Sequence, residues 1–270
     1  MSLAVLCFLF FLGAAVGVLA GMMGIGGGMI MVPFLVTVLT IEGYPPDIVI
    51  KMAIGTSLAT IIFTSVSSVW SHHKRNSVIW AVVRVMAPGI MLGALFGSQL
   101  VGLAPGKWVA LVFSAFLFWS AWSVAVRKPQ HRPEATDRRP KRTELAVGGL
   151  GIGAVSSILG AGGGFLTIPF LMARGVLPTR AVGCSSACGL PIALAGTIGY
   201  AIAGLSENLP GPVIGYLHIP ALLAISAASV LTAPYGVKLA HAVSPATLKK
   251  MFGVILLMLA TYMLIRSVST

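Results

Sequence analysis

Two glycine-rich stretches carry the residues of this chain that could do chemistry. Residues 24–35 read Gly-Ile-Gly-Gly-Gly-Met-Ile-Met-Val-Pro-Phe-Leu, and residues 160–171 read Gly-Ala-Gly-Gly-Gly-Phe-Leu-Thr-Ile-Pro-Phe-Leu. Because glycine clusters break helices, each stretch predicts a turn followed by the N-terminus of a new helix. A helix N-terminus carries free N–H groups and about half a positive charge, which favour a bound anion. The candidate substrate-binding positions in the turns are Gly26, Gly27, Gly28, Gly162, Gly163 and Gly164.

The two stretches belong to a longer internal repeat. When residues 13–35 are laid over residues 149–171 at a constant offset of 136, nine of the 23 positions are identical. The matches include the Pro-Phe-Leu ending, which glycine abundance alone does not explain. The sequence therefore predicts two homologous halves. We expect a first membrane repeat at 1–126, a basic linker at 127–144 and a second membrane repeat at 145–270.

A second repeated element follows each turn. Residues 53–57 read Ala-Ile-Gly-Thr-Ser, and residues 181–185 read Ala-Val-Gly-Cys-Ser. Hydroxyl groups can donate hydrogen bonds to an oxyanion, and the candidates here are Thr56, Ser57, Ser185 and Ser186. The alternative is that each side chain bonds the carbonyl four residues earlier in its own helix, as Ser and Thr in helices often do. Both interpretations remain open at this point.

The composition predicts an integral membrane protein. Of the 270 residues, 57% are hydrophobic and 9% are charged, whereas soluble domains carry about 25% charged residues. The net charge of +12 would suit nucleic acid, but seven of the eighteen basic residues lie in 127–142 and the others lie mostly between apolar runs. This distribution is typical of topology determinants, not of a nucleic-acid-binding surface. The first twenty residues belong to the repeat, and we expect them in the mature protein.

The long first apolar run must be broken at its glycines. Residues 3–41 contain no charge and are too long for one upright helix of about 20 residues. The turn either interrupts one crossing or forms a hairpin that returns to its own side. We expect a loop at 42–50 and further spans at roughly 51–70, 78–102, 106–126, 145–173, 181–204, 213–236 and 248–265.

The basic residues favour the hairpin. With hairpins, fourteen Lys and Arg lie on one side and three on the other, with Arg84 inside a span; with single crossings the split is ten against seven. Cytoplasmic loops collect Lys and Arg, so we expect the linker in the cytoplasm and both termini outside a bacterial-type inner (cell) membrane. The expected fold is an all-α polytopic membrane protein of two inverted repeats. Each repeat has a Gly-rich re-entrant or broken helical hairpin plus three transmembrane helices.

The predicted spans contain no Asp or Glu. A cation carrier usually keeps an acidic residue in the membrane, so the pattern favours a small anion held by peptide dipoles and hydroxyl groups. The alternative is that the glycines only allow helices to cross closely. We prefer that packing interpretation for the small-residue faces of the spans, such as Gly13 with Gly17 and Gly89 with Gly93.

Two Gly-x-Gly-Gly-Gly turns ending in Pro-Phe-Leu, each followed by a Gly-Thr-Ser-like element, resemble the TauE/SafE (TSUP) sulfite exporter family over nearly the whole chain. The resemblance implies a secondary transporter, an exporter of sulfite, an organosulfonate such as sulfoacetate or another small anion, that works by alternating access. It also implies that the glycine and hydroxyl positions named above face the substrate. Cys184 departs from the family's hydroxyl pattern. The alternatives are an anion channel and an uptake carrier for another small anion.

Three remaining residues have competing interpretations. Cys184 and Cys188 lie four apart on one helical face, which favours packing over a membrane-embedded sulfur enzyme. His218 could couple transport to protons, although a single His near an interface more often bonds a backbone group. We expect no enzymatic activity, cofactor or metal site, and the expected partners are a small anion and the lipid bilayer. Both a monomer and a homodimer fit this pattern.

Overall fold

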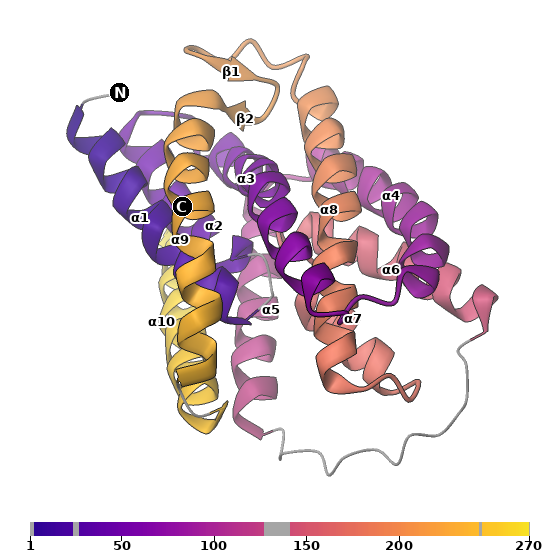
Figure 1. The fold of residues 1–270 in the computed structure, drawn as a ribbon. Helices are drawn as coiled ribbons and strands as arrows, with labels where there is room; N and C mark the ends of the chain where they lie inside the picture. The colour runs from indigo at the N-terminus through magenta and orange to yellow at the C-terminus, as the bar shows by residue number, and fades with distance from the viewer. Residues whose placement is uncertain (1–2, 24–26, 127–140, 243–244, 270) are drawn as a thin grey trace.

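The computed structural model describes residues 3–23, 27–126, 141–242 and 245–269. Over these residues the chain forms ten helices and one short β-hairpin (Figure 1). The first half contains α1 (Leu3–Met23), α2 (Gly28–Ile41), α3 (Pro46–Lys74), α4 (Trp80–Leu103) and α5 (Gly106–Val126). The second half contains α6 (Arg142–Ile158), α7 (Gly164–Met172), α8 (Pro178–Ala203), β1 (Val213–Ile214), β2 (Leu217–His218), α9 (Ile219–Ala242) and α10 (Pro245–Ser269).

Six of the helices in the described ranges are long and apolar enough to cross a bilayer, namely α1, α3, α4, α5, α8 and α9. Helix α10 contains a shorter apolar stretch, Gly253–Arg266. A helix rises 1.5 Å per residue, so the 29 residues of α3 exceed the roughly 30 Å of a hydrocarbon core. The prediction of an all-α polytopic membrane protein is confirmed.

Each glycine turn reverses the chain. Val5 near the start of α1 lines the same cavity as Glu42, Gly43 and Tyr44, which follow α2. In the second half, Arg174 after α7 lies 3.4 Å from the carboxylate of Glu144 in the first turn of α6. Both helix pairs therefore begin and end at one side of the molecule.

The two helix pairs open at opposite ends. At the end with the β-hairpin, at the top of Figure 1, Asp47 accepts a hydrogen bond from the Gly106 N–H and Arg266 donates to Thr40. At the other end, Ile79 before α4 donates its N–H to Cys184 Sγ near the start of α8, over 3.2 Å. These contacts place the loops before α3, α5 and α9 at one end, and those before α4 and α8 at the other.

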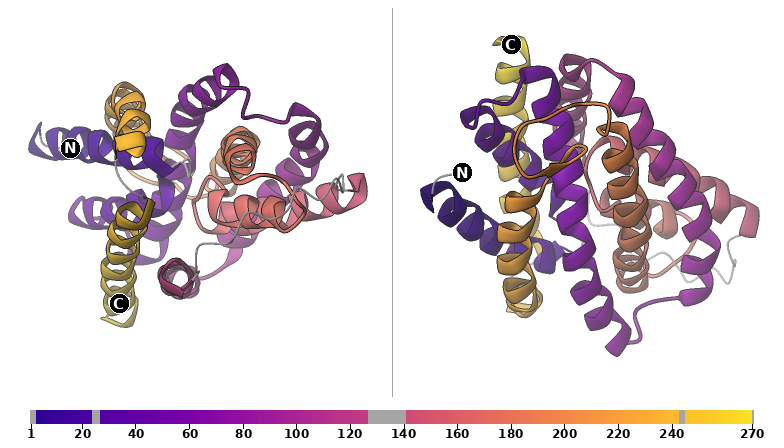
Figure 2. Two further views of the ribbon diagram at one scale, coloured as in Figure 1. Left: turned by 60° about the horizontal axis from the view of Figure 1, so that its bottom comes forward. Right: turned by 90° about the horizontal axis from the view of Figure 1, so that it is seen from above.

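Helices α3 and α8 pack against each other near the centre, with α1 on α9 and α4 on α6 to either side (Figure 2). Glycines allow these two outer pairs to approach closely. A Cβ atom on Gly13 would stand 2.6 Å from the Ile225 carbonyl oxygen, and one on Gly89 would collide with that of Ala146. The expectation that the small-residue faces serve packing is confirmed at these positions.

Two predicted boundaries are wrong. The expected loop at 42–50 ends at residue 45, because Pro46 starts α3, where its fixed φ suits the first helical position and its missing N–H is not needed. The expected span at 213–236 begins only at Ile219, because residues 213–218 form an antiparallel β-hairpin around Gly215, which has a φ of 56°. His218 therefore lies before the span, in β2, and not within it.

Candidate functional site

The two described turn glycines have nearly the same backbone. Gly27 precedes α2 with a φ of 67°, and Gly163 precedes α7 with a φ of 77°. Both values lie in the left-handed region, where glycine avoids the steric cost that other residues meet. The Gly27 carbonyl accepts hydrogen bonds from Ile30 and Met31, and the Gly163 carbonyl accepts from Leu166 and Thr167. Each turn thus starts a helix whose first N–H groups have no partner inside that helix.

The two turns meet in the interior. Ser57 Oγ on α3 lies 3.2 Å from the carbonyl oxygen of Gly28 and 3.2 Å from that of Gly160, so its hydroxyl bridges both segments. A Cβ atom on Gly28 would collide with the same Gly160 carbonyl. Ser57 is fully buried. Both of its hydrogen-bond acceptors lie outside its own helix, so its hydroxyl faces neither α3 nor solvent. Its position holds the first turn against the start of the second.

Thr56 and Cys184 occupy equivalent positions of the repeat and make equivalent contacts. Thr56 Oγ1 accepts the N–H of His218 over 2.9 Å, immediately before α9. Cys184 Sγ accepts the N–H of Ile79, the residue before α4. Both side chains are fully buried and anchor the chain entering the next helix. Thr56 does not line the cavity described next.

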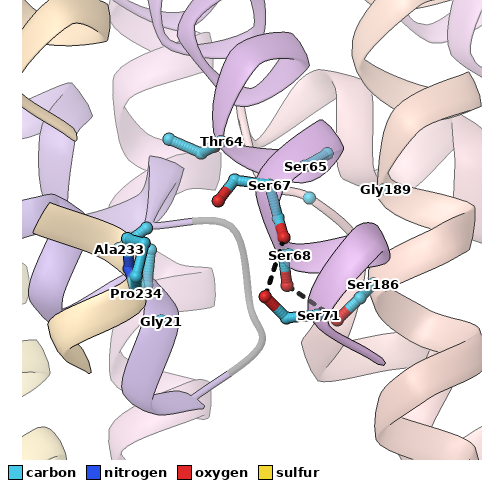
Figure 3. A pocket seen from close by; sticks show the side chains of 12 residues that line it. Gly21, Thr64, Ser65, Ser67, Ser68, Ser71, Ser186, Gly189, Ala233 and Pro234 are labelled. Atoms are coloured by element: carbon cyan, nitrogen blue, oxygen red, sulfur yellow. Dashed lines mark hydrogen bonds between the residues drawn. The ribbon is translucent and has the colours of Figure 1, made fainter. Parts of the chain in front are cut away.

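A small cavity that is open to solvent lies where the second turn approaches the end of α1 (Figure 3). Gly162 lines it from the turn, and Ser186 and Gly189 line it from α8. Ser68 donates to Ser186 over 3.3 Å across the cavity. No charged side chain is among the described residues that line this cavity. The remainder are Ala20, Gly21, Thr64, Ser65, Ser67, Ser68, Ser71, Ala233 and Pro234.

The α3 hydroxyls of this cavity are functional candidates that our sequence reasoning missed. Thr64, Ser68 and Ser71 recur at helical spacing within an apolar span, which places them on one face. That spacing was the available indication in the sequence. The hydroxyls make the cavity polar without adding charge.

Only some of the predicted glycine and serine positions lie at the cavity. Gly162 and Ser186 line it, whereas Gly28, Gly163 and Gly164 are buried behind it in the two turns. Ser185 is fully buried on α8, and its hydroxyl has no hydrogen-bond partner in the described part of the chain. Gly26 lies outside the described residues.

His218 lies at the opposite end, and its ring has two polar contacts and one aromatic contact. Its Nδ1 accepts the Ala221 N–H over 3.3 Å, so it caps α9, and its Nε2 lies 3.2 Å from a Glu42 carboxylate oxygen. The Tyr44 ring packs edge-on against the imidazole. Because Nδ1 is an acceptor, the geometry fits a neutral ring whose Nε2–H donates to Glu42. Burial lowers the pKa of His218 to about 4 and raises the pKa of Glu42.

The two cysteines of α8 form no metal site with other described residues. Cys184 and Cys188 are both buried and free of disulfides. No group of three or more His, Cys, Asp or Glu side chains that could hold a metal ion occurs in the described ranges. Cys184 is already engaged with the chain before α4.

Comparison with known proteins agrees with this architecture. A family model for the sulfite exporter TauE/SafE matches residues 9–263. A probable membrane transporter protein of Haemophilus influenzae is 34% identical over 264 residues, covering 97% of this chain and 98% of the relative. A second, from Methanocaldococcus jannaschii, is 29% identical and covers 97% of both chains. No solved structure matches significantly. The chain therefore belongs to the TauE/SafE sulfite exporter family and is a membrane transporter, not an enzyme.

Proposed function

We propose that the protein is a secondary transporter that exports a small sulfur-containing anion, such as sulfite or an organosulfonate, past the two glycine turns. The observation that carries the proposal is the meeting of the turns through Ser57, next to a cavity lined by hydroxyl groups. A buried site of neutral donors and helix N-termini stabilises an anion and offers a cation no counter-charge. The printed name of the matched family, sulfite exporter, supports the substrate class and the direction.

Inverted repeats provide the alternating access in this proposal. The helix pairs open at opposite ends, and the packing of α1 on α9 corresponds to that of α6 on α4. The Thr56–His218 contact likewise corresponds to the Cys184–Ile79 contact. Two matched halves that rock against each other around a shared centre would expose that centre to either side in turn.

The charge distribution supports an orientation with the linker in the cytoplasm and both termini outside an inner membrane. Lys74, Arg75, Arg174 and Arg180 lie at the end where α3 finishes and α8 begins. Ser71, at the same end of α3, is partly exposed, whereas Thr64 deeper in the cavity is buried. The cavity therefore faces the basic end, where an exporter loads its anion and positive potential attracts it.

Flux measurements on the purified protein in proteoliposomes test this function. Vesicles loaded with sulfite should lose it faster than protein-free vesicles, and an imposed proton gradient should drive accumulation if His218 couples the two. Flux that only equilibrates sulfite, with single-channel currents, would indicate an anion channel. Absence of any flux of sulfite, methanesulfonate or sulfoacetate in either direction would overturn the proposal.

A further inference from the structure

Two hydroxyl side chains at the second glycine turn are buried without a hydrogen-bond partner in the described residues. Ser156 on α6 is 1% exposed and Thr167 on α7 is 0% exposed. Buried hydroxyls nearly always have a partner, because an unmet one costs roughly 1–3 kcal/mol. The second turn therefore has two buried hydroxyls that are free to donate, as far as the described residues show.

Both hydroxyls lie beside the same glycine. A Cβ atom on Gly163 would stand 3.3 Å from Ser156 Oγ and 3.4 Å from Thr167 Oγ1, and it would also meet the end of the Ile192 side chain. The hydroxyls thus border the side of Gly163 where any other residue would carry its side chain. Gly162, the preceding residue, lines the cavity of Figure 3. The pair therefore borders Gly163, the residue next to the cavity-lining Gly162.

The first turn lacks this arrangement. At the repeat offset of 136, the residues equivalent to Ser156 and Thr167 are Ala20 and Met31. A Cβ atom on Gly27 would meet Val16 Cγ1 at 2.6 Å, Ala20 Cβ at 3.1 Å and the Val16 carbonyl oxygen at 3.3 Å, so no side-chain hydroxyl is among its three nearest neighbours. The nearby Thr60 hydroxyl is satisfied by the Ser57 carbonyl at 2.7 Å, with Met31 Sδ at 3.1 Å.

We infer that the substrate binds asymmetrically, with its –SO3 group at the second turn, where Ser156 and Thr167 donate hydrogen bonds to its oxygens. The inference rests on the proposed function and adds two binding residues to it. The N-terminus of α7 contributes its partial positive charge from the same side. Neutral hydroxyl donors and a helix N-terminus suit both inorganic sulfite and the sulfonate end of an organosulfonate, since the two share the –SO3 group.

Binding to the full-length protein in detergent tests the inference, with Ser156→Ala and Thr167→Val as separate variants. We expect each to weaken sulfite binding, measured by calorimetry, about tenfold or more, because each removes a hydrogen bond to a charged group. Neither side chain has a hydrogen-bond partner to lose among the described residues, so the melting temperatures without anion should stay at or above the wild-type value. The matched control is Ser120→Ala on α5, another fully buried hydroxyl without a partner in the described residues, which should bind as the wild type does.

The outcomes separate this inference from the proposed function. A wild-type protein that binds none of sulfite, methanesulfonate and sulfoacetate would contradict the proposed function itself. If the wild type binds and both variants bind equally well, the second-turn site is wrong while the function stands. Weakened binding of sulfite and methanesulfonate alike supports recognition of the shared –SO3 group, and weakened binding of only one identifies that anion as the ligand of this site.

Discussion

The two glycine turns share a backbone and differ in what surrounds it. Gly27 and Gly163 have φ values of 67° and 77° and cap their helices with the same pattern of carbonyl hydrogen bonds. The first turn is closed by Val16 and Ala20, and Ser57 ties it to the chain before the second. The second borders two hydroxyls that have no partner in the described residues, whereas the polar cavity is lined from both sides, by Ala20 and Gly21 as well as by Gly162. The repeat thus keeps the backbone of the turn, while the side chains around it differ, and we propose binding only at the second copy.

The same contrast appears where the repeat anchors the chain before α4 and α9. Thr56 holds the backbone of His218, whose ring contacts Glu42 and Tyr44. Cys184 holds the backbone of Ile79, which has no titratable side chain. Of these two contacts, therefore, only the one between Thr56 and His218 holds a residue with a titratable ring.

The largest expected effect comes from alanine at the turn glycines. Gly28→Ala should prevent folding, because its Cβ meets the backbone carbonyl of Gly160, which cannot move without displacing the second turn. Gly163→Ala should fold at a cost of about 1–2 kcal/mol for its positive φ, because Ile192 can shift its side-chain end, but it should lose anion binding. Yield and melting temperature in detergent, followed by calorimetry, distinguish the two.

The control for both is Gly151→Ala on α6, where a Cβ meets nothing within 4 Å. This variant should fold and transport normally. A Gly28→Ala protein that melts at the wild-type temperature would show that the turns are not in contact. Valine at Gly27 or Gly163 should abolish transport, since a β-branched side chain disfavours the turn.

The next largest difference in stability is expected between variants of Ser57 and Ser185, the equivalent serines of the repeat. Ser57→Ala should lower the free energy of unfolding by roughly 1–3 kcal/mol, because it leaves two buried carbonyls without their shared donor. Ser185→Ala at the equivalent position removes a buried hydroxyl without a partner in the described residues, so it should not lower the free energy of unfolding. Thermal unfolding in detergent measures both. Equal losses would mean that Ser57 does not bridge the turns.

The buried His218, which Thr56 holds in front of α9, predicts that the stability of the protein depends on pH through this end of the molecule. The folded-state pKa of His218 is lowered from 6.5 to about 4, so the unfolded state binds more protons between these values. Stability from this residue is complete above about pH 6.5 and is lost as the pH falls toward 4. Glu42, whose pKa is raised by burial, acts in the opposite sense, because its contribution is lost as the pH rises through its folded pKa.

His218→Asn isolates the histidine, because asparagine can still cap α9 and Glu42 is retained. The difference in melting temperature between wild type and variant should shrink as the pH falls from 7 to 4.5. A difference that stays constant over this range would exclude His218 as the source. Proton-driven sulfite accumulation in the same variant tests its coupling role separately.

The smallest effect is expected at the cysteines. In Cys184→Ser with Cys188→Ser, the new hydroxyl oxygen at 184 can still accept the Ile79 N–H. Transport should remain within about twofold of wild type. Complete loss of transport in a protein that folds would favour sulfur chemistry at this pair over packing.

The sequence was sufficient for features that depend on local chemistry and repetition. The glycine clusters, the apolar runs and the duplicated Pro-Phe-Leu ending predict the helix breaks and the membrane fold, because backbone preferences and burial in lipid act on short stretches. Pro46 as a helix start was readable in principle from its fixed φ. The β-hairpin at 213–218 could not be predicted from the sequence, because its residues are mostly apolar, like those of a span.

The roles of individual hydroxyls depend on tertiary contacts that no spacing rule supplies. Thr56 and Ser57 are adjacent, yet one bonds His218 and the other bridges Gly28 and Gly160. Ser156 and Thr167 are ordinary helix residues in the sequence, and only the approach of α6 and α7 around Gly163 brings them together. Long-range packing therefore determines which polar side chains are satisfied and which are left for a ligand.

A density map of the protein with bound selenite, an analogue of sulfite whose selenium scatters anomalously, tests the central claim most directly. The account predicts one anomalous peak beside Gly163, within hydrogen-bonding distance of Ser156 Oγ and Thr167 Oγ1, and none beside Gly27. A peak at the first turn, or only in the separate cavity lined by Asp47, Lys107 and Arg266, would contradict it.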